Sequence, residues 1–303
     1  MTSAPTTPAN QLTRLVFDDM PVRGLHVSLA SVWQHIVGNK DYPAAIRHAL
    51  GELTAAAVLL ASNLKFDGSL ILQVQGKGVL KMLVAEATSA HTCRATARWD
   101  EQAVMDEHTG LRDLLGEGGM FVMTLQPQNG EPWQGVVALE GDTIAQMLMD
   151  YMARSEQLDT HISLAANEHS AGGLLLQRLP EQDIAANAWA DVTTLAQTVT
   201  AAELTDLSAH TVLYRLFHQT PPRVFEPQNI EFACTCSRGK VSDMLLLLGG
   251  QEVGEAVAEQ GSIDISCDFC YAHYVFDETD VNTLFGMDVV RAAKDEAQKQ
   301  LSH

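Results

Sequence analysis

Short apolar runs bounded by turn-forming residues dominate the first 180 residues of the chain. Each run is rich in Val, Leu or aromatic residues, and Gly, Asn, Pro or Asp flanks it, which is typical of β-strands joined by turns. We expect two antiparallel groups of strands. The runs are RLVF, VRGLHVSL, SLILQVQG, GVLKMLVAEA, TCRATARW, MFVMTLQ, WQGVVALE and GGLLLQRL.

Two other stretches follow a helical period. From Pro43 to Asn63, apolar residues recur at steps of four and three and predict a helix that packs one face on a sheet. A second helix is expected to begin at Asp142 as its N-cap. Strands and helices in this irregular order favour an α+β fold over a doubly wound sheet. The apolar faces are Ile46, Leu50, Leu53, Ala57 and Leu60 in the first helix, and Ile144, Met147, Leu148, Tyr151 and Met152 in the second.

Residues 181–230 are predicted to form a helical linker after an α+β core domain at 1–180. Strand signals almost vanish after Pro180, and a narrow apolar stripe appears instead. Short helices rarely hold in water by propensity alone, so this segment needs a partner surface. Consecutive prolines in QTPPRVFEPQ then favour extended backbone. The stripe consists of Trp189, Val192, Leu195 and Val199.

Residues 231–303 are predicted to form a small C-terminal module. Its expected order is a Cys-x-Cys turn, a helix through VSDMLLLL, a helix through QEVGEAVAEQ, a hairpin with two cysteines and a terminal helix. The module contains 13 Asp and Glu against 5 Lys and Arg, and few aromatic residues. A module of this size struggles to fold without a staple such as a metal ion.

Composition and charge narrow the possible functions. The chain has 303 residues, of which 46% are hydrophobic and 19% charged, as in globular proteins of more than one domain. Its net charge of −19 opposes binding to nucleic-acid phosphates. MTSAPTTPANQLTRLVF does not resemble a secretory signal, and we expect no apolar stretch of 18 residues and hence no membrane span. A reducing, cytoplasmic setting is therefore expected.

Four of the five cysteines form two close pairs, Cys234 with Cys236 and Cys267 with Cys270, thirty residues apart. In a reducing compartment, clustered cysteines bind metal or do redox chemistry more often than they form structural disulfides. Two such pairs let four thiolates converge on one tetrahedral zinc ion, with an iron–sulfur cluster as the lesser alternative. A purely structural zinc ribbon stays open, although ribbons usually carry Cys-x-x-Cys at both ends and a loop of roughly 15 to 20 residues.

Oxidation would change such a site. Each cysteine has a second thiol two or three positions away, so oxidants are expected to form two local disulfides and expel the ion. Structural zinc contributes about 10–16 kcal/mol to a small metal-folded module, whereas a whole domain is stable by only about 5–15 kcal/mol. Oxidation should therefore unfold the module, loosen the helical linker and expose apolar surface that binds unfolding proteins.

The motif EFACTCSR, followed thirty residues later by CDFCYAHYVF, resembles the redox-switch domain of the bacterial 33 kDa chaperonin family. The resemblance extends through NLKFDGSLILQVQGKG, WQGVVALEGDTIAQMLMDYMARSEQL and AGGLLLQ, and covers the chain from about Leu12 to Phe276. The four-cysteine pattern shows no departure from the family. The two ends, MTSAPTTPANQ and AAKDEAQKQLSH, match nothing in it.

The resemblance implies a redox-regulated, ATP-independent holdase chaperone that is inactive while reduced and zinc-bound. Peroxide or hypochlorous acid, often with heat, would release one zinc ion, form the disulfides Cys234–Cys236 and Cys267–Cys270, unfold the module and linker, and favour a homodimer. The four cysteines would then be both the zinc ligands and the redox centre. Unfolded client proteins would be the partners, and no client-binding residue is carried over.

The remaining candidates carry weaker chemistry. Cys93 lies on an expected strand and is interpreted as a structural thiol rather than a second redox site, and His273 is a minor alternative zinc ligand. CDFC has the spacing of a thioredoxin dithiol but not its strand-to-helix context, and no enzyme motif is present. Two alternatives to a chaperone stay open: a zinc-stabilised scaffold whose cysteines never cycle, and a disulfide reductase.

Overall fold

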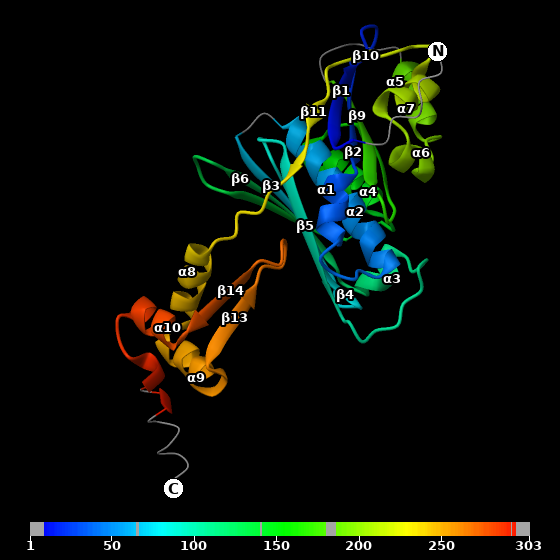
Figure 1. The fold of residues 1–303 in the computed structure, drawn as a ribbon. Coiled ribbons are helices and arrows are strands. Elements are labelled where there is room, and N and C mark those ends of the chain that lie inside the picture. The colour runs from blue at the N-terminus through cyan, green and yellow to red at the C-terminus, as the bar shows by residue number, and fades with distance from the viewer. Residues whose placement is uncertain (1–8, 65–66, 140, 180–185, 292, 295–303) are drawn as a thin grey trace. The chain divides into compact units, whose positions relative to one another are not determined.

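The computed structural model describes residues 9–64, 67–139, 141–179, 186–291 and 293–294 (Figure 1). The chain divides into two compact units, Met1–Ala233 and Cys234–His303, called here the first and the second unit. The predicted helical linker falls into the first unit, and the three-part division of the sequence stays a prediction.

Two six-stranded sheets form the framework of the first unit. All eight predicted runs are strands, and pairing within both sheets is antiparallel except between β12 and β5, so the predicted α+β class is confirmed. The first sheet has the order β10-β1-β2-β9-β8 with β11 beside β1; the strands are β1 (Gln11–Val16), β2 (Val22–Leu29), β8 (Thr160–Ala166), β9 (Ala171–Arg178), β10 (Arg223–Val224) and β11 (Gln228–Asn229). The second has the order β12-β5-β4-β3-β6-β7; the strands are β3 (Gly68–Gln75), β4 (Leu80–Thr88), β5 (Thr92–Trp99), β6 (Met120–Pro127), β7 (Trp133–Ala138) and β12 (Glu231–Phe232).

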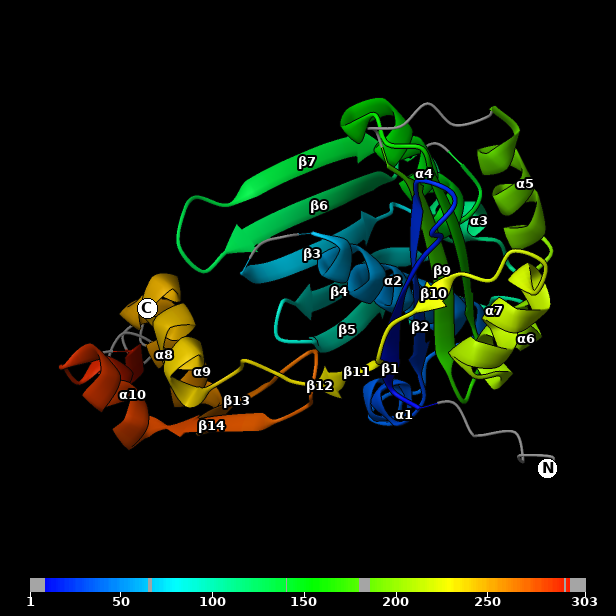
Figure 2. The ribbon, with the colours of Figure 1, turned by 90° about the horizontal axis from the view of Figure 1, so that it is seen from above.

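Helix α2 (Ala44–Asn63) packs against strands of both sheets, as Figure 2 shows. All five residues of its predicted apolar face are buried. However, residues on the other side of the helix, such as Ala55 and Leu59, are buried as well. The prediction of a single packing face was therefore too narrow, because a helix between two sheets is covered on both sides.

Helix α2 is also long and apolar enough to cross a membrane by length and composition, so the expectation that the chain lacks such a stretch was wrong. Alanine and leucine make up more than half of the helix, and its charged residues are Arg47 and Glu52. Within the protein, 78% of the most apolar 18-residue stretch of α2 is buried. This burial is what the core helix of a folded domain shows.

Three further helical segments complete this part of the first unit: α1 (Ser31–Val37), α3 (Leu111–Leu115) and α4 (Ile144–Tyr151), the last continued by η1 (Met152–Glu156). The predicted apolar residues of α4 and its continuation are all buried. The N-cap of α4 is Thr143, not Asp142 as predicted. Thr143 has extended backbone, and its hydroxyl accepts a hydrogen bond from the Gln146 N–H at 3.1 Å.

Helices α5 (Ala186–Ala196), α6 (Ala201–Asp206) and α7 (Ala209–Phe217) cover the outer face of the first sheet. This face is the partner surface that the helical segment needs. Val192 of the predicted stripe is buried, but Leu195 is 43% exposed and Ala196 takes the buried position instead. Gly172 of β9 permits the close packing, since a Cβ there would clash with the Leu204 carbonyl oxygen of α6.

Residues 218–233, called here the connector, make a turn at 218–220 after α7 and then run mostly in extended form, as the prolines predict. Strands β10 and β11 pair with β1, and β12 pairs with β5. Backbone hydrogen bonds join the Phe225 N–H to the Arg14 carbonyl at 2.9 Å and the Glu231 N–H to the His91 carbonyl at 3.0 Å. The connector thus contributes edge strands to both sheets of the first unit.

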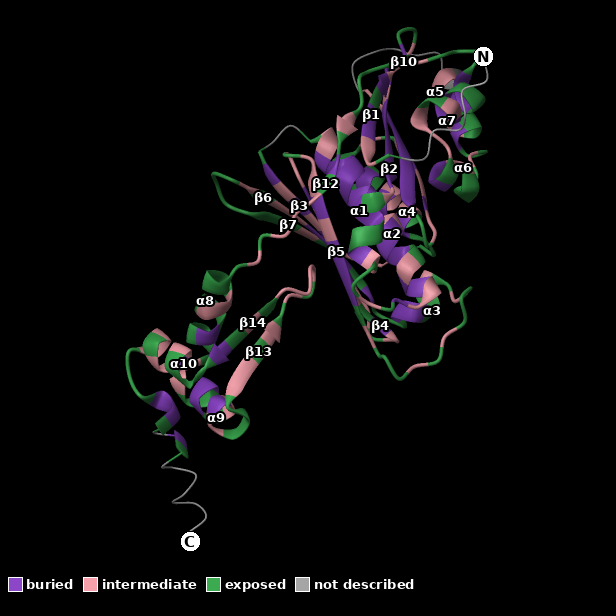
Figure 3. Ribbon diagram, viewed as in Figure 1, coloured by how far each residue is buried: buried purple, intermediate pink, exposed green. Residues whose placement is uncertain are grey.

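The second unit has the predicted order of elements: α8 (Arg238–Leu248), α9 (Gly250–Gln260), β13 (Ser262–Ser266), β14 (His273–Asp277) and α10 (Glu278–Phe285). Figure 3 shows that few of its residues are buried. Its core comprises seven buried apolar residues, Leu245, Val253, Val257, Phe276, Val281, Val289 and Val290.

Candidate metal centre

Two short turns of the second unit carry the four clustered cysteines. Cys234 and Cys236 lie directly before α8, whose N-cap Ser237 accepts a hydrogen bond from the Lys240 N–H at 3.2 Å. Cys267 and Cys270 lie in the turn between β13 and β14. There the Cys267 N–H donates to the Ala272 carbonyl at 3.0 Å, and the Tyr271 N–H donates to the Cys267 carbonyl at 2.9 Å. The helix cap and the hairpin therefore fix the backbone beside both pairs.

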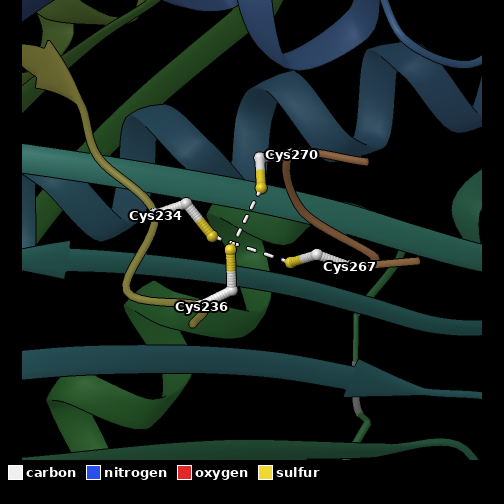
Figure 4. A group of neighbouring side chains, drawn as sticks. All are labelled: Cys234, Cys236, Cys267 and Cys270. Carbon is white, nitrogen blue, oxygen red and sulfur yellow. Dashed lines mark hydrogen bonds between the residues drawn. The ribbon is translucent and has the colours of Figure 1, made fainter. Parts of the chain in front are cut away.

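The four sulfur atoms gather at one point, and the side chains converge in Figure 4. All four Sγ atoms lie within 4.8 Å of one another, with Cys234 at 3.7 Å from Cys267 and Cys236 at 3.3 Å from Cys270. Sulfur ligands about 2.3 Å from a tetrahedral zinc ion are about 3.8 Å apart. The donor set and its spacing thus fit a four-coordinate metal ion, and the cysteines are free thiols rather than disulfides.

Three of the four thiols differ in pKa. The Tyr274 hydroxyl donates a hydrogen bond to Cys236 Sγ at 3.1 Å, which lowers the pKa of Cys236 to about 7. Burial raises the pKa of Cys267, and raises that of Cys270 to about 12. Of these three, Cys236 is therefore the thiol most readily present as thiolate, and a bound cation would favour the thiolate form of its neighbours.

Arg238 joins the Cys-x-Cys side of the cluster to the hairpin side. Its Nη1 donates to the Val275 carbonyl at 2.8 Å, its Nη2 lies 2.8 Å from Asp280, and its guanidinium stacks 4.1 Å from the centre of the Phe276 ring. The first residue of α8 is thus held to β14 and α10, which keeps the two cysteine turns together.

Two candidates from the sequence lie outside the cluster. Cys93 is buried in β5 of the first unit, where burial raises its pKa to about 12, as expected of an unreactive structural thiol. His273 pairs with Asp264 across the hairpin, with 3.0 Å between Nδ1 and Oδ1. The dithiol Cys267–Cys270 lies in a hairpin turn, not at the strand-to-helix junction of a thioredoxin site.

Tyr274 and Arg238 were missed in the sequence. A local signal for each exists: an aromatic residue follows Cys270 in CYAHY, and an arginine follows the helix cap after Cys236. Neither signal says that the side chain reaches across to the other half of the cluster. That contact depends on how the hairpin folds back beside α8.

Comparison with known proteins gives concordant results. The family model described as Hsp33 protein matches residues 10–277. The 33 kDa chaperonin of Neisseria meningitidis serogroup A is 70% identical over 286 residues, which cover 94% of this chain and 95% of that protein. The 33 kDa chaperonin of Chromobacterium violaceum is 51% identical over 288 residues, covering 94% and 97%. The crystal structure of the 33 kDa chaperonin from Thermotoga maritima has a TM-score of 0.77 at 22% identity, covers 91% of this chain and 98% of that one, and supports the fold.

Proposed function

This chain belongs to the Hsp33 family, and from that premise we propose that it is a redox-regulated holdase chaperone whose switch is the four-cysteine cluster. Its relatives are named chaperonins rather than enzymes, and it acts as a chaperone. The finer proposal is that the reduced protein holds zinc on Cys234, Cys236, Cys267 and Cys270 and is inactive, whereas oxidation activates it without ATP.

The observation that carries this proposal is the convergence of four thiols in a unit with little other core. Four sulfur ligands at tetrahedral spacing suit zinc, which has no redox chemistry of its own at such a site. When bound, zinc would keep the thiolates deprotonated and link the Cys-x-Cys turn to the hairpin. Loss of that link would remove much of what holds the second unit together.

The redox step takes place on the cysteines themselves. One thiolate attacks a peroxide oxygen, becomes a sulfenic acid and releases hydroxide, which takes up a proton to give water. The second thiol then attacks the sulfenic sulfur, and a disulfide forms as a second water leaves. Each disulfide thus accounts for two electrons and one peroxide. We propose the pairs Cys234–Cys236 and Cys267–Cys270, because each partner is a near neighbour in the chain and all four sulfurs lie within 4.8 Å.

Unfolding of the second unit would then loosen the connector and the helices of the first unit. Helices α5 to α7 cover apolar residues of the first sheet, among them Leu15, Phe17 and Leu174. Once uncovered, such a surface binds apolar segments of unfolding client proteins and favours pairing of two oxidised chains. Few cysteines in close pairs are typical of proteins in a reducing compartment, so we propose a cytoplasmic location.

The test is to treat the reduced, zinc-loaded protein with peroxide at raised temperature. We expect release of one zinc ion per chain, loss of four thiols and a gain in suppression of aggregation of a thermally unfolding client. Cys93→Ser is the matched control and should behave as the wild type, because Cys93 is buried in the first unit and is not one of the four clustered thiols. Zinc release with no gain in suppression would overturn the proposal, and thiols that stay reduced would favour the zinc-stabilised scaffold.

A further inference from the structure

Three arginines line one pocket where the connector meets the first sheet. The pocket has a volume of about 330 Å³, and Arg14 of β1, Arg23 of β2 and Arg223 of β10 face it, together with Phe225 and the end of α2. Among the described residues of its lining there is no Asp or Glu. In a chain with 38 acidic and 19 basic residues, three arginines without a carboxylate in their pocket are a marked local excess of positive charge.

Two of the three guanidinium groups, those of Arg14 and Arg23, are held by hydrogen bonds but have no carboxylate partner among the described residues. Arg23 donates from Nε and Nη2 to Oε1 of the buried Gln177, at 3.2 and 2.6 Å. Arg14 makes a single long hydrogen bond to the Ser62 carbonyl, at 3.4 Å. Within the described part of the chain neither has an ion pair, and Arg223 pairs only with the exposed Asp18 at 2.9 Å. Burial, and then the charge of Arg14, lower the pKa of Arg23, which is further evidence of uncompensated positive charge.

We propose that this pocket binds a phosphate-type oxyanion through Arg14, Arg23 and Arg223. Planar guanidinium groups match the paired oxygens of phosphate and bind them with charge-assisted hydrogen bonds. A volume of about 330 Å³ lies at the lower end of the range for small-molecule sites, roughly 300–1,000 Å³. A purely structural role at the end of α2 accounts for the one long Arg14 bond, but not for three arginines around one cavity.

The bound anion would link the connector to the core. Arg223 belongs to the connector, whereas Arg14 and Arg23 belong to strands of the first sheet. Strand β10 has only two residues, and beside it the Phe225 N–H donates to the Arg14 carbonyl. A ligand that binds only the docked connector lowers the undocked population by the factor 1 + [L]/Kd, about a hundredfold at 100 times Kd. The anion would therefore hold the connector on the sheet.

The binding test uses the full, reduced, zinc-loaded chain titrated calorimetrically with orthophosphate and, separately, with tripolyphosphate at constant ionic strength. Arg14→Gln and Arg23→Gln should each weaken binding at least about tenfold, since each removes a charge-assisted hydrogen bond. Arg178→Gln is the matched control and should bind as the wild type, because Arg178 pairs with Asp159 at 3.2 Å on the same sheet and does not line the pocket. The anion that binds more tightly shows whether the site takes a single phosphate or a phosphate chain.

The linkage test follows hydrogen exchange of the Phe225 amide. Saturating anion should slow this exchange in the wild type and in Arg178→Gln, but not in Arg223→Gln. Arg14→Lys keeps the charge without the planar group and should bind with intermediate affinity, which separates anion recognition from a folding defect. No binding of either anion at millimolar concentration, or equal binding by Arg14→Gln and Arg23→Gln, would overturn the proposal. The site lies within the first unit, so neither result depends on the cysteine chemistry.

Discussion

The two units of this protein are stabilised by different means. Two apolar clusters, of 43 and 13 buried residues, fill the first unit between its sheets and under its helices, whereas the described part of the second unit has one cluster of seven. The second unit has instead four convergent thiols and a polar clamp at Arg238. If the four thiols bind zinc as proposed, the structure of the second unit would depend on ligands that oxidants change, whereas the first unit is stabilised by buried apolar residues, which oxidants leave intact.

Removal of zinc should produce the largest difference in stability between the two units. Chelation of the metal, or Cys267→Ser, should cost the second unit the apparent 10–16 kcal/mol that is roughly typical of structural zinc. Amide protection in α9, β13 and β14 should be lost, while protection in α2 stays, as measured by hydrogen exchange with mass spectrometry. Cys93→Ser should leave both units folded. If β13 and β14 stay protected without metal, the seven-residue core holds the second unit alone.

Truncation of a core side chain should destabilise the first unit and leave the metal site of the second unit unchanged. Leu50 of α2 is fully buried between the two sheets, so Leu50→Ala should lower the free energy of unfolding of the first unit by about 2–5 kcal/mol. Zinc stoichiometry and chelator resistance should not change. Leu247→Ala in α8 is the control, because Leu247 is 88% exposed and surface changes stay within about 0.5 kcal/mol. A loss of zinc affinity in Leu50→Ala would mean that the metal site depends on the first core.

The sequence predicts the secondary structure of the first unit better than its packing. Short apolar runs between turn residues locate most strands of the first unit, and the helical period locates α2 and α4. These patterns exist because each strand or helix buries apolar side chains against its neighbours. They do not show that α2 is covered on both sides, or that Ala196 replaces Leu195 in the core, because tertiary packing decides which side chain faces the sheet. The parallel pairing of β12 with β5 joins residues far apart in the chain and leaves no local signal.

At the cysteine cluster the sequence predicts which four thiols come together but not the residues around them. The two close pairs are a local property of the sequence, so they can be recognised without the fold. Tyr274 and Arg238 act through contacts with the opposite half of the cluster, at 3.1 Å to Cys236 and 2.8 Å to Val275. Such contacts depend on the fold of the hairpin beside α8, which no short motif encodes.

Acid should lower the stability of the first unit through protonation of His26 in the unfolded chain. This residue is fully buried in β2, and neither ring nitrogen has a hydrogen-bond partner in the described structure. Burial lowers the pKa of His26 from 6.5 to about 4. As pH falls, the unfolded chain binds a proton at about 6.5 but the folded one does not until about 4, so the free energy of unfolding falls across this window by about 3 kcal/mol.

The acid effect is measured as a difference between variants. Burial raises the pKa of Glu52 to about 7, so the folded state takes up that proton first between pH 7 and 4.5, which opposes the His26 effect. His26→Leu should therefore gain stability relative to the wild type as pH falls from 7 to 4, by urea unfolding at each pH. His108→Leu removes an exposed imidazole instead of a buried one and is the matched control for the substitution. A constant difference between His26→Leu and the wild type would contradict the pKa assigned to His26.

Loss of one tyrosine hydroxyl should weaken metal binding in the second unit, whereas loss of a tyrosine hydroxyl in the first unit should have no measurable effect. Tyr274→Phe removes the hydroxyl that donates to Cys236 Sγ at 3.1 Å and leaves the ring in place. Loss of a partner that orients a metal ligand typically costs about 10–100-fold in metal affinity, and we expect about tenfold, measured by competition with a chelator of known affinity. Tyr214→Phe removes a hydroxyl from a residue 66% exposed in the first unit and should change neither affinity nor stability. Because metal binding and folding of the second unit are linked, weaker metal binding should also lower the temperature at which this unit unfolds. Unchanged affinity in Tyr274→Phe would mean that the four thiols alone determine the strength of the site.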